Sequence, residues 1–182
     1  GSFSYALDLT EGQPAGHSLR AAFIAVSMAR AMGLSDADCL TVHYATLMKD
    51  LGCSSNAARI AALYLTDDRQ FKQDYKRVDG RLANVLAFVF SNTGREAPLG
   101  RRVSAVANIL KNGVEISRQL IQTRCVRGAD IARQLRLGDD VADAILSLDE
   151  HWDGSGKPQG LAGHAIPLAS RLALLAQVAD VW

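Results

Sequence analysis

The chain has 182 residues, of which 48% are hydrophobic and 21% are charged, a composition that suits a globular domain with its own core. The formal charge is only +1, which gives no global electrostatic drive toward nucleic acid or a membrane surface. No apolar run reaches the roughly 18 residues that span a bilayer, and no secretory leader opens the chain. The three cysteines lack CxxC spacing and indicate reduced thiols. We therefore expect a cytoplasmic protein.

The predicted elements are almost all helices. Apolar residues recur at helical spacing over 16–33. In the segment 35–52, Ser35 as N-cap and Asp38 three residues later outline a capping box. Further helices are predicted over 56–65, 82–90, about 101–111, 114–137, 139–152 and 168–182, with 66–80 as a loop or solvated helix and the best internal break at 91–100. The sequence thus predicts a single all-α domain over 1–182, of seven or eight helices, as part of a longer chain.

Polar residues on the first two predicted helices are candidates for a site. His43 and Asp50 are seven residues apart, so on a continuous helix they share one face. That spacing could hold a metal ion or a proton pair, or His43 could simply bond to a backbone group. Lys49 precedes Asp50 after an apolar run, and burying an unpaired charge is costly, so both need partners or a cleft. His17 begins the first predicted helix, as a cap or a ligand.

A second candidate group lies where the predicted helix 139–152 ends and a glycine-rich loop begins. Negative charge at the end of a helix opposes the helix dipole unless cations compensate. The acidic residues and histidine of this group are Asp149, Glu150, His151 and Asp153, and the cations that could compensate them are Lys49, Arg124, Arg127 and Lys157. The alternative is a solvated acidic helix end.

The stretch DEHWDGSGKPQGLAGHAIPLASR resembles the signature loop of the HD-GYP family. That pattern runs His-His-Glu, Trp-Asp-Gly-x-Gly-Tyr-Pro, Gly-Leu-x-Gly, and Ile-Pro before an arginine. Two further segments, GHSLRAAFIAVSMARAMGLS and ATLMKDLG, resemble the family's first-histidine helix and its His-Asp helix in the expected order. The resemblance covers most of the chain and leaves 53–115 as a divergent middle. The segments EGQPAGHSLR and KDLGCSSNAA also resemble the sub-branch joined to helix-turn-helix regulators, although the sequence contains no recognisable DNA-binding element.

The resemblance implies an all-helical, HD-domain-like bundle and a metal-dependent phosphodiesterase that opens cyclic di-GMP. In that family, histidines and carboxylates hold two or three iron or manganese ions, which activate a water and neutralise developing charge. His17 matches the first metal histidine, and Asp50 matches the aspartate of the His-Asp pair.

At the other ligand positions the chain departs from the family pattern. The resemblance implies a glutamate where the chain has Gln13, a histidine at Lys49 and a lysine at Cys53. It implies a histidine at Arg124 and a His-His pair at Leu148-Asp149. It also implies a tyrosine at Lys157 and an aspartate at Gln177. A protonated lysine or an arginine cannot ligate a metal. We therefore expect Lys49 and Arg124 to neutralise Asp50, Asp149 and Glu150 in place of metal ions.

Two functions follow from these residues. The first is a degenerate HD-GYP-like domain without cyclic di-GMP phosphodiesterase activity or cofactor, which senses or binds a cyclic dinucleotide or another small molecule. It would dimerise or regulate an attached output domain, with no direct contact to nucleic acid or membrane. Its vestigial catalytic residues would be Lys49, Asp50, Asp149 and Glu150, and its ligand-binding residues Arg124, Trp152, Asp153 and Lys157.

The second function is a metal-dependent phosphohydrolase or cyclic di-GMP phosphodiesterase with a rearranged site. A single iron, manganese or zinc ion would be held by His17, His43 and Asp50, with Asp149 or His151 as a further ligand.

Overall fold

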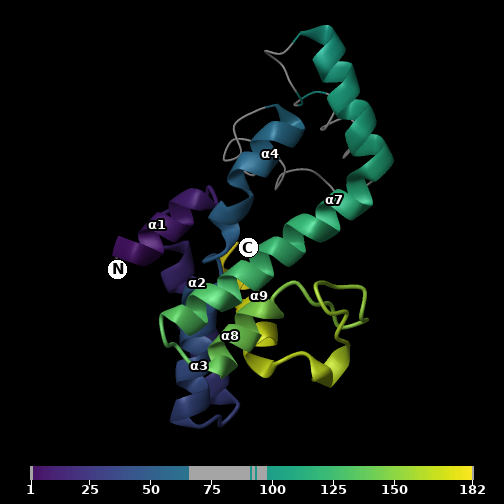
Figure 1. Cartoon of the computed structure of the whole chain (residues 1–182). Coiled ribbons are helices and arrows are strands. Elements are labelled where there is room, and N and C mark those ends of the chain that lie inside the picture. Colours follow the sequence, from purple (N-terminus) through teal and green to yellow (C-terminus); the bar gives the residue numbers. More distant parts are fainter. Residues whose placement is uncertain (1, 66–90, 92, 94–97, 182) are drawn as a thin grey trace.

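In the computed structural model, residues 2–65, 91, 93 and 98–181 are described, and within these ranges the regular structure is helical (Figure 1). The α-helices are α1 (Ser2–Thr10), α2 (His17–Ala31), α3 (Asp36–Leu47), α4 (Ala57–Tyr64), α7 (Leu99–Gln134), α8 (Asp139–Leu146) and α9 (Leu168–Val181), and short 3-10 helices cover Cys53–Asn56 and Gly163–Ala165. The predicted all-α fold is confirmed. The predictions for 66–80 and 82–90 lie outside the described residues, and none of the described helices is long and apolar enough to cross a membrane.

The core of the domain lies where α2 packs against α3 and α9. Ala21, Ala25 and Ala29 recur every four residues and form one buried stripe along α2. They pack in one cluster with Ala45 of α3 and Ala176 of α9. Because alanine side chains are short, the three helices can approach one another closely. The C-terminal part of α7 packs on α8, whereas its N-terminal part extends away from this core beside α4 (Figure 1).

Helix α1 was not among the predicted elements, and it caps the next helix. Asp8 is buried and accepts hydrogen bonds from Gly16 N (2.9 Å), Ser18 N (3.0 Å) and Ser18 Oγ (2.6 Å). The N-cap residue of α2 is Gly16, whose φ of 84° suits glycine but which has no side chain to cap the helix. The carboxylate of Asp8 therefore takes the capping role, favourable at the positive end of the helix dipole. This contact fixes where α2, and with it His17, begins.

Three predicted helix boundaries were wrong. The helices expected over 101–111 and 114–137 are one helix, α7, because a glycine inside a helix costs only about 1 kcal/mol and need not end it. The helix expected over 139–152 ends at Leu146, since the glycine-rich loop begins earlier. The helix expected over 35–52 ends at Leu47 and continues as turns. His43 and Asp50 therefore do not share a helical face.

The turn after α3 reaches α7 through Gly52. A Cβ atom at Gly52 would lie 1.9 Å from the Arg124 carbonyl oxygen and 2.8 Å from the Gly128 nitrogen. Glycine is thus required here by the close approach of two backbones rather than by its dihedral angles. This approach brings Asp50 next to Arg124.

We expect Gly52→Ala to lower the free energy of unfolding by about 2–3 kcal/mol, because the turn must separate from α7. Gly113→Ala in α7 is the matched control, since a Cβ there would have no neighbour within 4 Å among the described residues. It is expected to stabilise the helix by about 0.5–1 kcal/mol. Urea denaturation followed by circular dichroism measures both. Equal stability of the two variants would contradict the close approach.

Candidate functional site

A small cavity lies between the turn after α3, the middle of α7, the end of α8 and α9. Its volume of about 60 Å³ has room for only a few water molecules. It is lined by Lys49, Asp50, Arg124, Cys125, Ile145, Leu148, Asp149, Leu174 and Gln177. Two of the lining side chains are cations and two are carboxylates, so the charges of the cavity balance. The cavity therefore joins residues that the sequence analysis had selected at three separate places in the chain.

Lys49 and Asp50 form a buried ion pair in this cavity, as predicted. The Lys49 side chain is 3% exposed. Burial, the largest single influence, raises the pKa of Asp50, but the charge and hydrogen bond of Lys49, together with Arg124 and Cys53, outweigh it and hold that pKa below its usual range. Asp50 is therefore a carboxylate at neutral pH, and Lys49 is its direct counter-ion.

Arg124 and Asp149 form the second predicted ion pair. Burial opposes the charge of Arg124, yet the charge and hydrogen bond of Asp149 help to keep the pKa of the guanidinium above its usual value. Cys125 donates from Sγ to Asp149 Oδ2 at 3.1 Å. Burial and the charge of Asp149 raise the pKa of this thiol to about 12. Cys125 is thus a neutral thiol. All three cysteines are buried, and none of them forms a disulfide.

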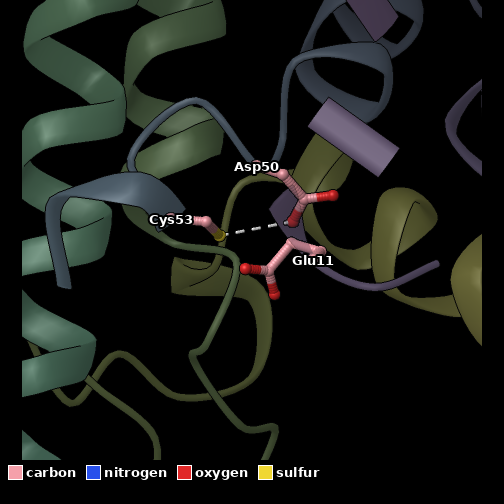
Figure 2. A group of neighbouring side chains, drawn as sticks. All are labelled: Glu11, Asp50 and Cys53. Carbon is pink, nitrogen blue, oxygen red and sulfur yellow. Dashed lines mark hydrogen bonds between the residues drawn. The ribbon is translucent and has the colours of Figure 1, made fainter. Parts of the chain in front are cut away.

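Glu11, Asp50 and Cys53 place two carboxylates and a thiol together (Figure 2). One ligand atom from each lies within 4.8 Å of the others, and all three residues are buried. Cys53 Sγ donates to Asp50 Oδ1 at 3.6 Å. Glu11 directly follows α1. It was not among the predicted site residues, because the resemblance aligned the family's glutamate ligand with Gln13. Such a group can hold one divalent cation if the thiol is deprotonated.

His17 is buried at the start of α2 and pairs with α9. Its Nδ1 atom is 2.7 Å from Asp180 Oδ2, and Arg20 holds the same carboxylate through Nε at 2.6 Å and Nη2 at 3.0 Å. The hydrogen bond from Arg20 is the main reason that the pKa of Asp180 is lowered. His17 Nε2 is buried and has no hydrogen-bond partner among the described residues. Metal-ligating histidines typically bond one ring nitrogen to a carboxylate and bind the metal through the other, and His17 has this arrangement without a metal.

Asp180 was missed by the sequence analysis, which placed the family's aspartate at Gln177. The two residues are three apart in α9 and so lie on neighbouring positions of one helical face. The structure places Gln177 at the cavity and Asp180 against His17. The sequence feature that could have identified this residue was the aspartate itself, in the segment VADVW.

Glu150 does not join the ion pairs, which corrects the prediction that Lys49 and Arg124 neutralise it. Its Oε1 accepts from Gln159 N (2.6 Å) and Gly160 N (3.1 Å), and its Oε2 accepts from Leu161 N (2.8 Å). The carboxylate is buried and holds the glycine-rich loop closed on itself. Its position in the signature is therefore explained by the conformation of the loop.

The remaining predicted site residues lie outside the cavity. Asp153 is exposed and accepts from Ser155 N at 2.9 Å and Ser155 Oγ at 2.6 Å, and these bonds lower its pKa. His43 makes an edge contact with Tyr44. The cavity lining does not include His17, His43, His151, Trp152, Asp153 or Lys157. Among the described residues, the potential metal-ligand group that contains Asp50 is formed with Glu11 and Cys53.

A two-metal centre does not fit these residues. Lys49 and Arg124 place a primary ammonium and a guanidinium beside the carboxylates that would have to ligate the ions, and neither group has a lone pair to offer. A second positive charge brought to Asp50 would have to displace Lys49. The unpaired His17 Nε2 and the Glu11, Asp50 and Cys53 group leave room for at most a rearranged single-ion site within the described part of the chain.

Comparisons with known proteins identify the family. The sequence model of the HD-domain family matches residues 81–180. The chain is 50% identical over 181 residues to 3′3′-cGAMP-specific phosphodiesterase 3 of Vibrio cholerae serotype O1, covering 100% of this chain and 39% of the relative. It also resembles the crystal structure of a cyclic GMP-AMP-specific phosphodiesterase of V. cholerae, with a TM-score of 0.67 and 43% identity over 99% of this chain and 39% of that one.

These relatives are closer to the second predicted function, the phosphohydrolase, than to the first. They support a phosphohydrolase function and do not show a loss of activity. The chain spans 39% of the length of the curated relative, so the activity of that whole protein is not assigned to this chain by similarity alone. The match over 81–180, the all-α fold and the signature loop agree, and the chain belongs to the HD-domain family, in its HD-GYP-type branch.

Proposed function

We propose that this chain is a single HD-GYP-like domain over 1–182 of a longer cyclic-dinucleotide phosphodiesterase, in which it binds ligand and regulates rather than performs two-metal hydrolysis. The substrate class is supported by the V. cholerae relative, which is named for 3′3′-cGAMP. The regulatory role is supported by the ion pairs at the positions of metal ligands. An attached output domain or a second copy of the chain would receive the signal, in the cytoplasm.

The observation that carries the proposal is the pair of internal salt bridges, Lys49–Asp50 and Arg124–Asp149. Metal ions in a phosphodiesterase lower the pKa of a bound water toward 7 and stabilise the charge that develops on phosphorus. An ammonium or guanidinium that is already paired with a carboxylate lowers the pKa of a water and stabilises charge on phosphorus less than a metal ion does. The cavity is also small, at about 60 Å³, and a phosphodiester in an in-line arrangement with a water needs more room.

We expect the chain to show no turnover of 3′3′-cGAMP or cyclic di-GMP in the presence of iron(II), manganese(II) or zinc(II). Product formation is followed by chromatography, and Asp50→Asn, which removes the charge but keeps the shape, is the matched control. Both proteins should give the same background. Metal-dependent turnover that Asp50→Asn abolishes would assign the reaction to this domain.

A second candidate is a phosphohydrolase that uses one metal ion, and a specific observation favours it. Glu11, Asp50 and Cys53 bring three ligand atoms within 4.8 Å, and His17 Nε2 is buried without a partner in the described residues. An ion held there would act as a Lewis acid on a phosphoryl oxygen. Turnover that is lost in Cys53→Ala as well as Asp50→Asn would identify this rearranged site.

A further inference from the structure

A second concave surface lies next to the ion-pair cavity and is not explained by it. We call it the Trp152 groove, after Trp152 at its rim. Its volume is about 390 Å³, which falls within the range of about 300–1,000 Å³ typical of small-molecule sites. Its apolar lining includes Met32, Leu148, Ile166 and Leu175. The groove is therefore large enough for a nucleotide, whereas the ion-pair cavity is not.

Trp152 is presented at this groove by a fixed set of contacts. Its side chain is large and the residue is 59% exposed. The guanidinium carbon of Arg171 lies 5.8 Å from the indole centroid, and His164 meets the ring edge-on, with centroids 5.2 Å apart and planes at 80°. A cation over the ring and an edge contact both hold the indole in place. An exposed but oriented indole is a platform on which a flat aromatic ligand can stack.

Arg171 also brings an unused donor to the groove that it lines. Its Nε atom is buried and has no hydrogen-bond partner among the described residues, while its Nη1 is 3.4 Å from His164 Nδ1. Buried donors in folded proteins are nearly always paired. A ligand with an acceptor on a planar ring would supply the missing partner. The nearby carboxylate of Glu150 does not compete, because the amides of the loop occupy both its oxygens.

The groove and the ion-pair cavity share a wall, since Leu148 and Leu174 line both. The signature loop and the start of α9 therefore form a concave surface adjacent to the ion-pair cavity. The groove lining holds one carboxylate, Glu150, whose oxygens accept from the loop amides, and one cation, Arg171. Arg171 is therefore the lining charge that can face an anionic ligand. An apolar, indole-bearing groove with a guanidinium at its edge matches a nucleotide better than it matches a neutral lipid or a peptide.

We infer that the Trp152 groove binds a purine base of a cyclic dinucleotide, with the base stacked on the Trp152 indole and a ring acceptor of the base bonded to Arg171 Nε. This inference rests on the proposed function for its ligand class. It adds a binding position outside the ion-pair cavity and needs no metal ion.

Tryptophan fluorescence tests the inference directly. The chain has two tryptophans, Trp152 and Trp182, so Trp182→Phe leaves Trp152 as the single reporter. Titration of this variant with 3′3′-cGAMP should quench the emission in a saturable way.

Calorimetry measures how each substitution changes binding. Trp152→Ala should weaken binding about tenfold or more, and Trp152→Phe should retain most of it. Arg171→Met should weaken binding without loss of the folded signal in circular dichroism. Phe23→Ala changes an aromatic residue of α2 that is 75% exposed and outside the groove, and should bind as the wild type does.

Binding that Trp152→Ala leaves unchanged, or the absence of binding and quenching in the wild-type chain, would overturn the inference. A wild-type dimer that Trp152→Ala converts to a monomer, without nucleotide binding, would also overturn it and make the groove a protein interface. Turnover is followed in the same samples. Metal-dependent hydrolysis with intact quenching would refute the regulatory role alone and leave the base position standing.

Discussion

Lys49→Met is expected to lower the free energy of unfolding by about 3–5 kcal/mol, because it leaves Asp50 buried without its direct counter-ion. Methionine keeps most of the length of the side chain and removes the ammonium group, with its charge and its donors. The double variant Lys49→Met/Asp50→Leu should recover much of this loss, since an ion pair replaced by apolar groups of similar size is close to neutral. Urea denaturation of the two single variants, the double variant and the wild type gives the coupling energy.

The pH dependence of stability should follow the same pair. The pKa of Asp50 is lower in the folded chain than its usual value, so the carboxylate contributes stability above its unfolded pKa. That contribution is lost as the pH falls through the folded pKa. In Lys49→Met the acid-dependent loss should be smaller than in the wild type, because without Lys49 burial raises the folded pKa of Asp50 toward or above its unfolded value. A Lys49→Met chain as stable as the wild type would mean that the ammonium is not the counter-ion of Asp50.

Glu150→Ala is expected to destabilise the chain by about 3 kcal/mol and to open the glycine-rich loop. Three backbone amides, at Gln159, Gly160 and Leu161, lose a charged acceptor. Hydrogen bonds to charged groups contribute about 1.5–3 kcal/mol each, and partial exposure of the loop lets water replace some of that. Hydrogen exchange measured by mass spectrometry should show lost protection over 159–161.

Asp153→Ala is the matched control for Glu150→Ala in the same loop. Asp153 is exposed, and within the described part of the loop its side chain accepts from Ser155, so the change should cost about 1 kcal/mol or less. A Glu150→Ala chain that keeps its loop protection and its stability would contradict the structural role of Glu150. It would return this residue to the catalytic role that its place in the signature implies.

The two ion pairs could be predicted because their reason is local and electrostatic. Lys49 follows an apolar run, so its charge needed a partner near the core. Arg124 stands where the resemblance implies a metal histidine, so it was expected beside the carboxylates. The loop could be predicted because its glycines, Trp152 and prolines occur at fixed spacing. In both cases short segments of sequence carry the physical constraint.

The contacts of His17 and Asp8 could not be predicted in the same way. His17 meets Asp180, which is 163 residues away, and only the packing of α2 on α9 selects Asp180 over Gln177 as its partner. Asp8 caps α2 from a separate helix. The turn after α3 meets α7 through Gly52. Each of these is a tertiary contact between separate elements, which a local sequence pattern does not predict.

The measurement that tests the central proposal most directly is the metal content of the purified chain. The chain is exposed to iron(II), manganese(II) and zinc(II), freed of excess metal by gel filtration, and analysed by plasma mass spectrometry beside Asp50→Asn. The ion pairs at Lys49 and Arg124 predict far less than one bound ion per chain and no difference between the two proteins. Stoichiometric metal that is lost in Asp50→Asn would contradict the replacement of metal ions by side-chain cations.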